Sequence, residues 1–272
     1  YQYKINIMEF TFIPLALVII ASIFQGSFGL GMKFMAPLKW EAWWLVHAFI
    51  AMFLLPLAWA YMVVPDLFTV ISNAPIESIF TGMLFGLLWG IGGIMFGKSV
   101  PYIGISLTYG IVMGLCAAAG SLIPLFTKDN AVDLPSLPYI IIGIVIMLIG
   151  VAITAVAGIQ RDKLNKSEIS QKVHIKTGLT IAVLSGLLSA LLSVGFDNGK
   201  PIGDLATDAG ALSRNSSLAI WVVVLWGGFL MNAGYAIFLL FKNKTWDSFL
   251  VKKKKKKRRR ICSNRWRSKN CR

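Results

Sequence analysis

Few ionisable side chains lie within the apolar segments of this chain, so each of them is a candidate for chemistry. His47 stands inside one such segment, and an imidazole can gain or lose a proton near neutral pH. Asp197 stands at the end of another segment, where its carboxylate could also titrate. A charge among apolar groups is costly unless it is paired or neutralised. We therefore name His47 and Asp197 as proton-carrying candidates, with a packing role for His47 and a loop-edge position for Asp197 as the alternatives.

Three neutral side chains in the apolar segments could contact a solute or hold helices together. Gln25 and Asn232 are amides that interrupt apolar runs. If the runs are membrane spans, such an amide either bridges two helices, for about 0.6–2 kcal/mol, or faces a cavity. Trp89 lies in the middle of a third run, so its ring could stack on a substrate or pack between helices. The tryptophans that we expect to anchor a membrane interface are Trp40, Trp43, Trp44 and Trp59.

Glycines recur at helical spacing in two of the apolar segments. Small residues on one face let two helices approach closely, so we expect these positions to pack helices, although the same face could line a substrate path. The cluster at 90–93 does not form a nucleotide-binding loop, because no Gly-Lys-Ser/Thr and no strand–turn–helix pattern accompanies it. The predicted packing positions are Gly82, Gly86, Gly90, Gly93, Gly97, Gly110 and Gly114.

Composition identifies the elements that must hold these side chains. The 272 residues are 56% hydrophobic and 14% charged, with a mean hydropathy of +0.69. Soluble domains carry about 25% charged residues, so the composition indicates an all-α polytopic membrane protein. The sequence has no GxSxG, HExxH or Walker motif, and its three cysteines lack metal-ligand spacing. We expect no enzymatic activity, no metal and no cofactor.

Seven stretches are long and apolar enough to cross a bilayer, which takes about 20 residues of helix. The basic residues of the loops alternate between two sides, with eight on one side and three on the other. Since Lys and Arg stay in the cytoplasm, the N-terminus is expected outside and the basic segment 161–176 inside. The predicted spans are 10–32, 43–64, 79–97, 102–123, 138–159, 177–194 and 217–241.

Four local motifs together resemble the L-rhamnose–proton symporter family, a branch of the drug/metabolite transporter superfamily. The resemblance covers about residues 10–245 and depends on the order and spacing of the motifs. They are Trp40-Glu41-Ala42-Trp43-Trp44 after Lys33, Leu55-Pro56 with Pro65, Trp89-Gly90-Ile91-Gly92 followed by Gly97 and Tyr102-Ile103-Gly104-Ile105-Ser106, and Asn198-Gly199-Lys200-Pro201.

The resemblance implies ten helices in two inverted five-helix repeats, of which this chain would contain seven. Residues 1–160 would form the first repeat, 161–176 a cytoplasmic linker, and 177–241 the first two helices of the second repeat. Residues 242–272 would form a basic tail, in which 252–272 hold 13 Lys and Arg and no acid. We expect this tail to arise from a frameshift or truncation that leaves the chain unstable or inactive. A native polybasic segment that binds anionic lipid is the alternative.

The resemblance also implies proton-coupled uptake of L-rhamnose across the bacterial inner membrane. The partners would be the sugar, protons and the lipid bilayer, with no nucleic acid and no obligate protein partner. Transport of another sugar or metabolite, or a membrane protein that transports nothing, remain alternatives. The substrate-binding candidates are Gln25, Trp89, Asn198, Lys200 and Asn232. Lys200 could equally mark the membrane interface.

Overall fold

The computed structural model describes residues 2–27, 31, 34–35, 38–126, 137–164 and 175–250, and within these residues all regular structure is helical. The chain divides into two compact units. We call Tyr1–Trp43 with Phe238–Arg272 the terminal unit and Trp44–Ile237 the central unit. The basic tail from 251 onward and most of the predicted linker lie outside the described residues.

Six helical segments of the described chain are long and apolar enough to cross a membrane. The prediction of an all-α polytopic membrane protein is therefore confirmed. The first helix, α1 (Gln2–Ser27), contributes a shorter apolar stretch, Phe12–Ser27, so the predicted count of seven spans stays a prediction. The six segments are Trp40–Val63, Ile76–Ile103, Ile105–Ile123, Leu137–Thr154, Lys176–Asp208 and Ser213–Asn243.

The segment predicted as one span at 43–64 is interrupted by a π-helix. It consists of α3 (Trp40–Ala48), the π-helix η1 (Phe49–Leu54) and α4 (Leu55–Val63). Pro56 explains the interruption, because proline has no backbone N–H and its ring would clash with the carbonyl four residues earlier. The Leu55 N–H instead bonds to the Ile50 carbonyl, five residues back. The wider turn accommodates the proline without ending the span.

The loop predicted between 97 and 102 is wrong. Helix α6 (Ile76–Ile103) runs through Lys98 and Pro101, and α7 (Ile105–Phe126) begins two residues after α6 ends. Gly104 makes the turn with φ 78°, a backbone conformation that residues with a side chain rarely adopt. The predicted loop was placed at Lys98 because a charge there interrupts the apolar run, but hydropathy does not show where the backbone turns.

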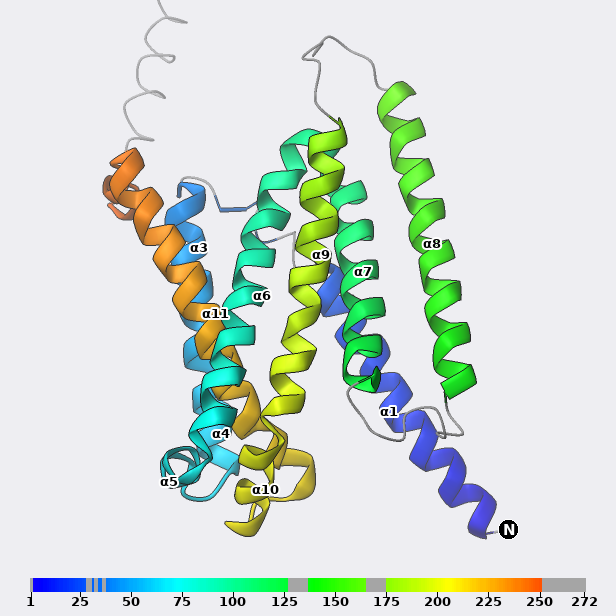
Figure 1. Cartoon of the computed structure of the whole chain (residues 1–272), viewed down its shortest axis with the longest axis vertical. Coiled ribbons are helices and arrows are strands. Elements are labelled where there is room, and N and C mark those ends of the chain that lie inside the picture. Colours follow the sequence, from blue (N-terminus) through cyan, green and yellow to red (C-terminus); the bar gives the residue numbers. More distant parts are fainter. Residues whose placement is uncertain are drawn as a thin grey trace, which may run out of the picture. The chain divides into compact units, whose positions relative to one another are not determined.

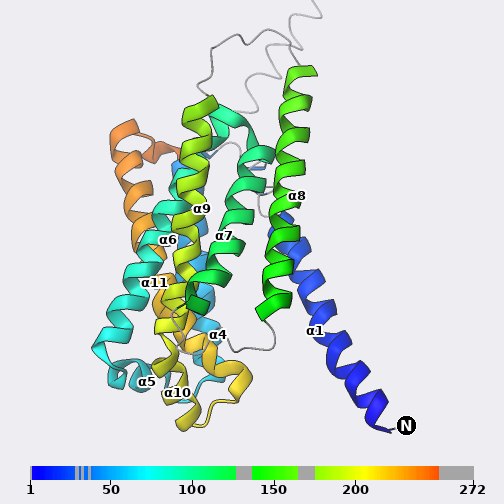
Figure 2. The same cartoon turned by 45° about the vertical axis from the view of Figure 1, so that its right-hand side comes forward.

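The long helices of the central unit pack on α6 or on its neighbours. Helix α9 (Ile175–Asn198) lies beside both α6 and α7 in the two views (Figures 1 and 2). The Ser185 Oγ of α9 donates a 2.7 Å hydrogen bond to the Gly92 carbonyl of α6. Helix α8 (Leu137–Leu164) packs through Thr154 and Val151 on α7. Helix α11 (Ser213–Asn243) packs on α6 at Gly82, Gly86 and Gly90.

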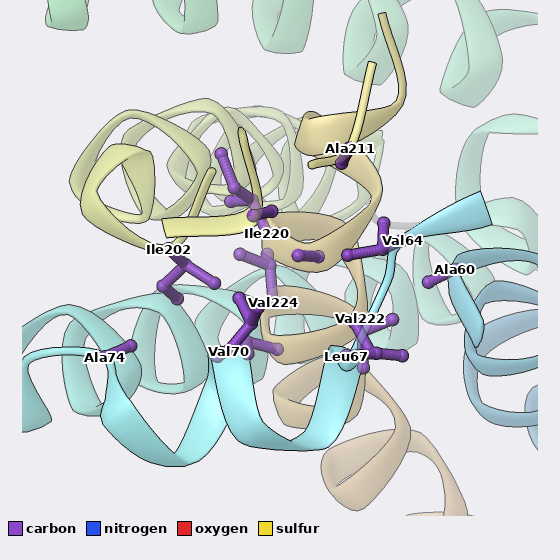
Figure 3. Close-up of a cluster of buried hydrophobic side chains, with 13 residues drawn as sticks. Ala60, Val64, Leu67, Val70, Ala74, Ile202, Ala211, Ile220, Val222 and Val224 are labelled. Carbon is purple, nitrogen blue, oxygen red and sulfur yellow. The ribbon is translucent and has the colours of Figure 1, made fainter. Parts of the chain in front are cut away.

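Two short helices lie outside the predicted spans, and they help to form the largest buried cluster. Helix α5 (Leu67–Asn73) follows α4, and α10 (Lys200–Asp208) follows α9. Their apolar side chains meet those of α4 and α11 (Figure 3). The cluster consists of Ala60, Val64, Leu67, Val70, Ala74, Ile202, Ala206, Ala211, Ala219, Ile220, Val222, Val223 and Val224. This cluster anchors one end of α11 in the central unit.

Candidate functional site

A hydrogen bond between two buried side chains joins α3 to α11. The Trp44 Nε1 donates to Asn232 Oδ1 at 3.0 Å, although the two residues are 188 positions apart. Asn232 is 1% exposed, and its Nδ2 donates to the Gly228 carbonyl at 2.8 Å. Because an indole N–H can only donate, it fixes the amide oxygen toward Trp44. Of the two roles left open for Asn232, the structure shows the bridge between helices.

Trp44 does not lie where the sequence placed it. We expected it to anchor a membrane interface, but its side chain is 5% exposed and faces Asn232. Trp59, by contrast, is 63% exposed. A tryptophan near the end of an apolar run is typical of an interfacial anchor, and only the distant partner on α11 distinguishes Trp44 from that class.

His47 lies one turn after Trp44 on α3. The two ring centroids are 5.4 Å apart and the rings are tilted by 35°. His47 is half-buried. This places one proton-carrying candidate next to the buried Trp44–Asn232 pair, within the central unit.

The close approach of α6 and α11 depends on glycines from both helices. A Cβ at Gly90 would lie 2.8 Å from the Met231 Cβ and 3.0 Å from the Asn232 Nδ2. A Cβ at Gly86 would collide with the Val224 backbone oxygen. Real Cβ atoms essentially never approach a neighbour within 3.0 Å. Side chains at these positions would force the two helices apart.

Trp89 extends from α6 over a glycine of α11. A Cβ at Gly228 would come within 2.6 Å of the Trp89 ring, so the indole lies flush against the α11 backbone. Gly228 also offers the carbonyl that accepts from Asn232. Trp89 is half-buried, which leaves part of its ring accessible. The structure thus brings two of the predicted substrate candidates, Trp89 and Asn232, to one glycine.

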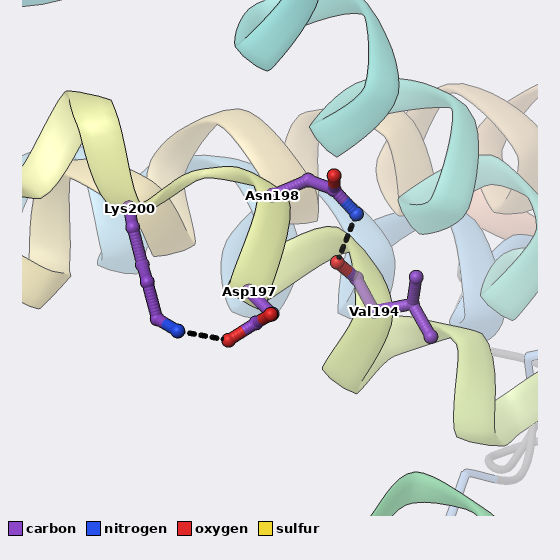
Figure 4. Close-up of polar contacts among 4 residues, drawn as sticks. All are labelled: Val194, Asp197, Asn198 and Lys200. Atoms are coloured by element: carbon purple, nitrogen blue, oxygen red, sulfur yellow. Dashed lines mark hydrogen bonds and ion pairs between the residues drawn. The ribbon is translucent and has the colours of Figure 1, made fainter. Parts of the chain in front are cut away.

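The other predicted candidates lie elsewhere. Asp197 forms an ion pair with Lys200 at the junction of α9 and α10, and Asn198 donates to the Val194 carbonyl of its own helix at 2.9 Å (Figure 4). Asn198 and Lys200 are exposed. Gln25 lies on α1 in the terminal unit. These candidates therefore lie on other elements than the buried Trp44–Asn232 pair, which joins α3 to α11.

The remaining predicted packing positions divide between two contacts. Gly82 faces Val223 and Val224 of α11, and Gly93 faces the Asn232 Oδ1 at 3.9 Å. Gly97 is half-buried on α6, one turn further along. On α7, a Cβ at Gly110 would lie 3.0 Å from the Thr154 Oγ1, and one at Gly114 would collide with Val151. These last two glycines place α7 against α8.

Aromatic side chains that the sequence analysis did not single out gather beside the π-helix. Phe53 stacks on Trp226 with centroids 5.7 Å apart, and it also lies 5.2 Å from Phe229. Phe49 lies 5.7 Å from Phe53. Trp226 and Phe229 are three residues apart on α11, and Phe49 and Phe53 are four apart on η1. In the sequence, only this helical spacing of aromatic residues could have indicated that the four rings form a group.

A cation lies near the other end of the α6–α11 contact. The Lys98 Nζ lies 5.2 Å from the centroid of the Tyr235 ring. Tyr235 follows Asn232 by three residues on α11, and Lys98 lies on α6, so this contact also joins the two helices. In the described residues no group of three or more His, Cys, Asp or Glu side chains could hold a metal ion.

These features define a helical multi-pass membrane protein whose facing helices are joined by buried polar and aromatic side chains. The chain matches the family "L-rhamnose-proton symport protein (RhaT)" over residues 10–254, and it belongs to this family. It is similar to an L-rhamnose-proton symporter of Yersinia pestis bv. Antiqua (strain Antiqua), with 29% identity over 216 residues. The alignment covers 76% of this chain and 63% of that protein.

A second relative gives the same result. The L-rhamnose-proton symporter of Yersinia pseudotuberculosis serotype O:1b (strain IP 31758) is 29% identical over 216 residues, which cover 76% of this chain and 62% of the relative. The chain thus spans less than two thirds of the length of these relatives. No solved structure matches the chain.

Proposed function

We propose that this protein takes part in proton-coupled uptake of L-rhamnose across the bacterial inner membrane. The observation that carries the proposal is the family match over residues 10–254. The contents of the central unit are compatible with it, because a sugar carrier needs aromatic surfaces for the ring and hydrogen-bonding groups for the hydroxyls. We propose no catalytic activity, in keeping with a family of symporters.

We further propose the arrangement that the sequence predicted. Helix α1 would form the first of seven spans, within a fold of ten helices in two inverted five-helix repeats. The N-terminus would lie outside, and the segment 161–176 would lie in the cytoplasm. The charges support this orientation, because even without Lys98, which lies on α6, seven of the ten other basic residues counted belong to the predicted cytoplasmic loops.

Within this proposal the sequence candidates take different roles. Trp89 offers a partly accessible ring, so we assign it to sugar stacking. Asn232 uses its amide on Trp44 and Gly228, so we assign it to positioning. His47, beside Trp44, is the better-placed proton carrier, since the Asp197 carboxylate is already paired with Lys200. Gln25, Asn198 and Lys200 remain candidates for contacts with the sugar along its path.

Transport in liposomes tests the proposal. The purified 272-residue chain and a version restored to ten helices are reconstituted in parallel, a proton gradient is imposed, and uptake of labelled L-rhamnose is followed with and without a protonophore. We expect the restored version to show uptake that follows the gradient and is abolished by the protonophore, and the 272-residue chain to show little or none. Competition by unlabelled L-rhamnose, but not by unrelated sugars, would support the substrate. Gradient-independent accumulation, or specific binding of another solute with none of L-rhamnose, would contradict the proposal.

A further inference from the structure

The Trp226 indole N–H is buried without a hydrogen-bond acceptor. Its Nε1 is one of only two side-chain polar atoms of the described residues that are fully buried and unpaired, the other being the Ser248 Oγ of the terminal unit. A buried donor without an acceptor loses its hydrogen bonds to water without forming one in the protein, which lowers the stability of the folded state. Native proteins rarely retain such a group, and one that persists calls for a functional or structural explanation.

The surroundings of Trp226 explain why the donor is unpaired. The indole stacks on Phe53, with 26° between the ring planes, and Phe53 in turn contacts Phe229 and Phe49. None of these phenylalanine side chains has an oxygen or nitrogen atom that could accept a hydrogen bond. The arrangement therefore combines an apolar aromatic surface with a single unused donor.

The backbone beside this aromatic group is also irregular. Phe49 and Phe53 belong to the π-helix, and short π-helical turns within α-helices occur frequently at functional sites. Pro56 cannot donate to a carbonyl of the preceding turn, so one helical acceptor loses its regular donor. The irregular turn and the unpaired indole therefore lie on the two sides of one contact, between η1 and α11.

A second indole of the same unit provides the comparison. Trp44 lies on α3, immediately before the π-helix, and its N–H is fully used by Asn232. The contact of α11 with the segment from α3 to η1 thus contains two indoles. The Trp44 N–H donates to a protein acceptor, and the Trp226 N–H does not. A purely structural role would account for the first but not for the second.

We propose that Trp226 and Phe53 form a subsite for the transported sugar, in which the Trp226 N–H donates to a sugar hydroxyl and Phe53 contacts the C–H face of the ring. An aromatic face suits the apolar side of a pyranose, and an indole N–H supplies a donor that this apolar surface otherwise lacks. This inference rests on the proposed function, since it identifies part of the binding site.

Two tryptophan substitutions distinguish a sugar donor from a packing residue. Trp226→Phe keeps an aromatic ring but removes the unpaired donor, whereas Trp44→Phe removes a donor that is already bonded. We expect Trp226→Phe to leave the melting temperature of the sugar-free protein unchanged or to raise it. We expect Trp44→Phe to lower it. Both are measured by differential scanning fluorimetry of the 272-residue chain in lipid nanodiscs.

Binding of L-rhamnose to the same preparations supplies the second readout. Loss of one hydrogen bond to a neutral hydroxyl should weaken the Kd of Trp226→Phe by about two- to tenfold. Phe53→Leu, which removes the stacked ring, should also weaken binding. The control is Trp221→Phe, on the same helix and 4.9 Å from Phe196, which should bind like the parent chain.

The outcomes separate this inference from the proposed function. If neither the 272-residue chain nor a version restored to ten helices binds L-rhamnose, the proposed function is contradicted. If the parent binds, but Trp226→Phe binds with the same Kd, the subsite is wrong while the function stands. If Trp226→Phe lowers the melting temperature as well as the affinity, Trp226 is a packing residue, and this result would also overturn the subsite. Weaker binding with an unchanged or higher melting temperature would support it.

Discussion

Removal of the Asn232 amide should destabilise the central unit, because it removes the acceptor of the Trp44 N–H. In Asn232→Leu the side chain keeps its branching at Cγ but loses both polar atoms, so the Trp44 N–H loses its 3.0 Å acceptor while it stays buried. A neutral hydrogen bond contributes about 1 kcal/mol, and an orphaned buried donor costs about 1–3 kcal/mol. Hydrogen bonds between membrane helices average about 0.6 kcal/mol. We therefore expect a loss of about 1–2 kcal/mol in the free energy of unfolding.

A double-mutant cycle isolates the bond from other effects of the substitution. Asn232 also donates to Gly228 within its own helix, so the single variant alone does not measure the Trp44 contact. The cycle combines Asn232→Leu with Trp44→Phe, and unfolding is followed by circular dichroism in mixed micelles. Since the two side chains touch, we expect a coupling energy of about 0.5–1.5 kcal/mol. A coupling energy indistinguishable from zero would refute the bridge between α3 and α11.

Three other perturbations test the packing, the cation and the orientation. Gly90→Leu should abolish stable folding, because even a Cβ there would lie 2.8 Å from Met231, and normal expression and melting would contradict this. Lys98→Gln should cost about 0.5–1 kcal/mol of stability, and no further loss should follow in a Tyr235→Leu background if the cation acts through that ring. In a background without native cysteines, Asp208→Cys should react in intact cells with an impermeant maleimide and Lys244→Cys should not, whereas the reverse pattern would invert our topology.

Hydropathy alone predicted the class of the fold and the approximate positions of six spans, because a bilayer tolerates few other patterns. Helix α8 is the clearest case, since its window of Leu137–Thr154 has the highest mean hydropathy of the six segments, 2.6. The turn between α6 and α7 could not be found this way. It depends on the conformation of Gly104, whereas Lys98 remains helical two turns before it. Charge therefore misplaced a turn that backbone geometry determines.

The candidate site was predictable only for residues that are unusual in their own segments. Asn232 and Trp89 are polar or bulky where their neighbours are apolar, and both lie at the α6–α11 contact. Trp44 was expected only as an interfacial anchor, and Trp226 was not singled out although it also lies in an apolar run. Their roles depend on partners far along the chain, and nothing local distinguishes a bonded indole from an unpaired one. Such pairings require the tertiary structure.

Helix α11 has two contact surfaces of different character. Toward α6, Gly227 lies against the Met83 backbone and Gly228 lies against the Trp89 ring, so a side chain at either glycine would separate the helices. Toward η1 it offers Trp226 and Phe229, whose rings contact Phe53 through non-directional surfaces. In the proposed transport cycle, we expect movement of α11 to occur on the η1 side, where the π-helix departs from regular geometry and the Trp226 N–H lacks an acceptor, rather than at the close glycine contact with α6.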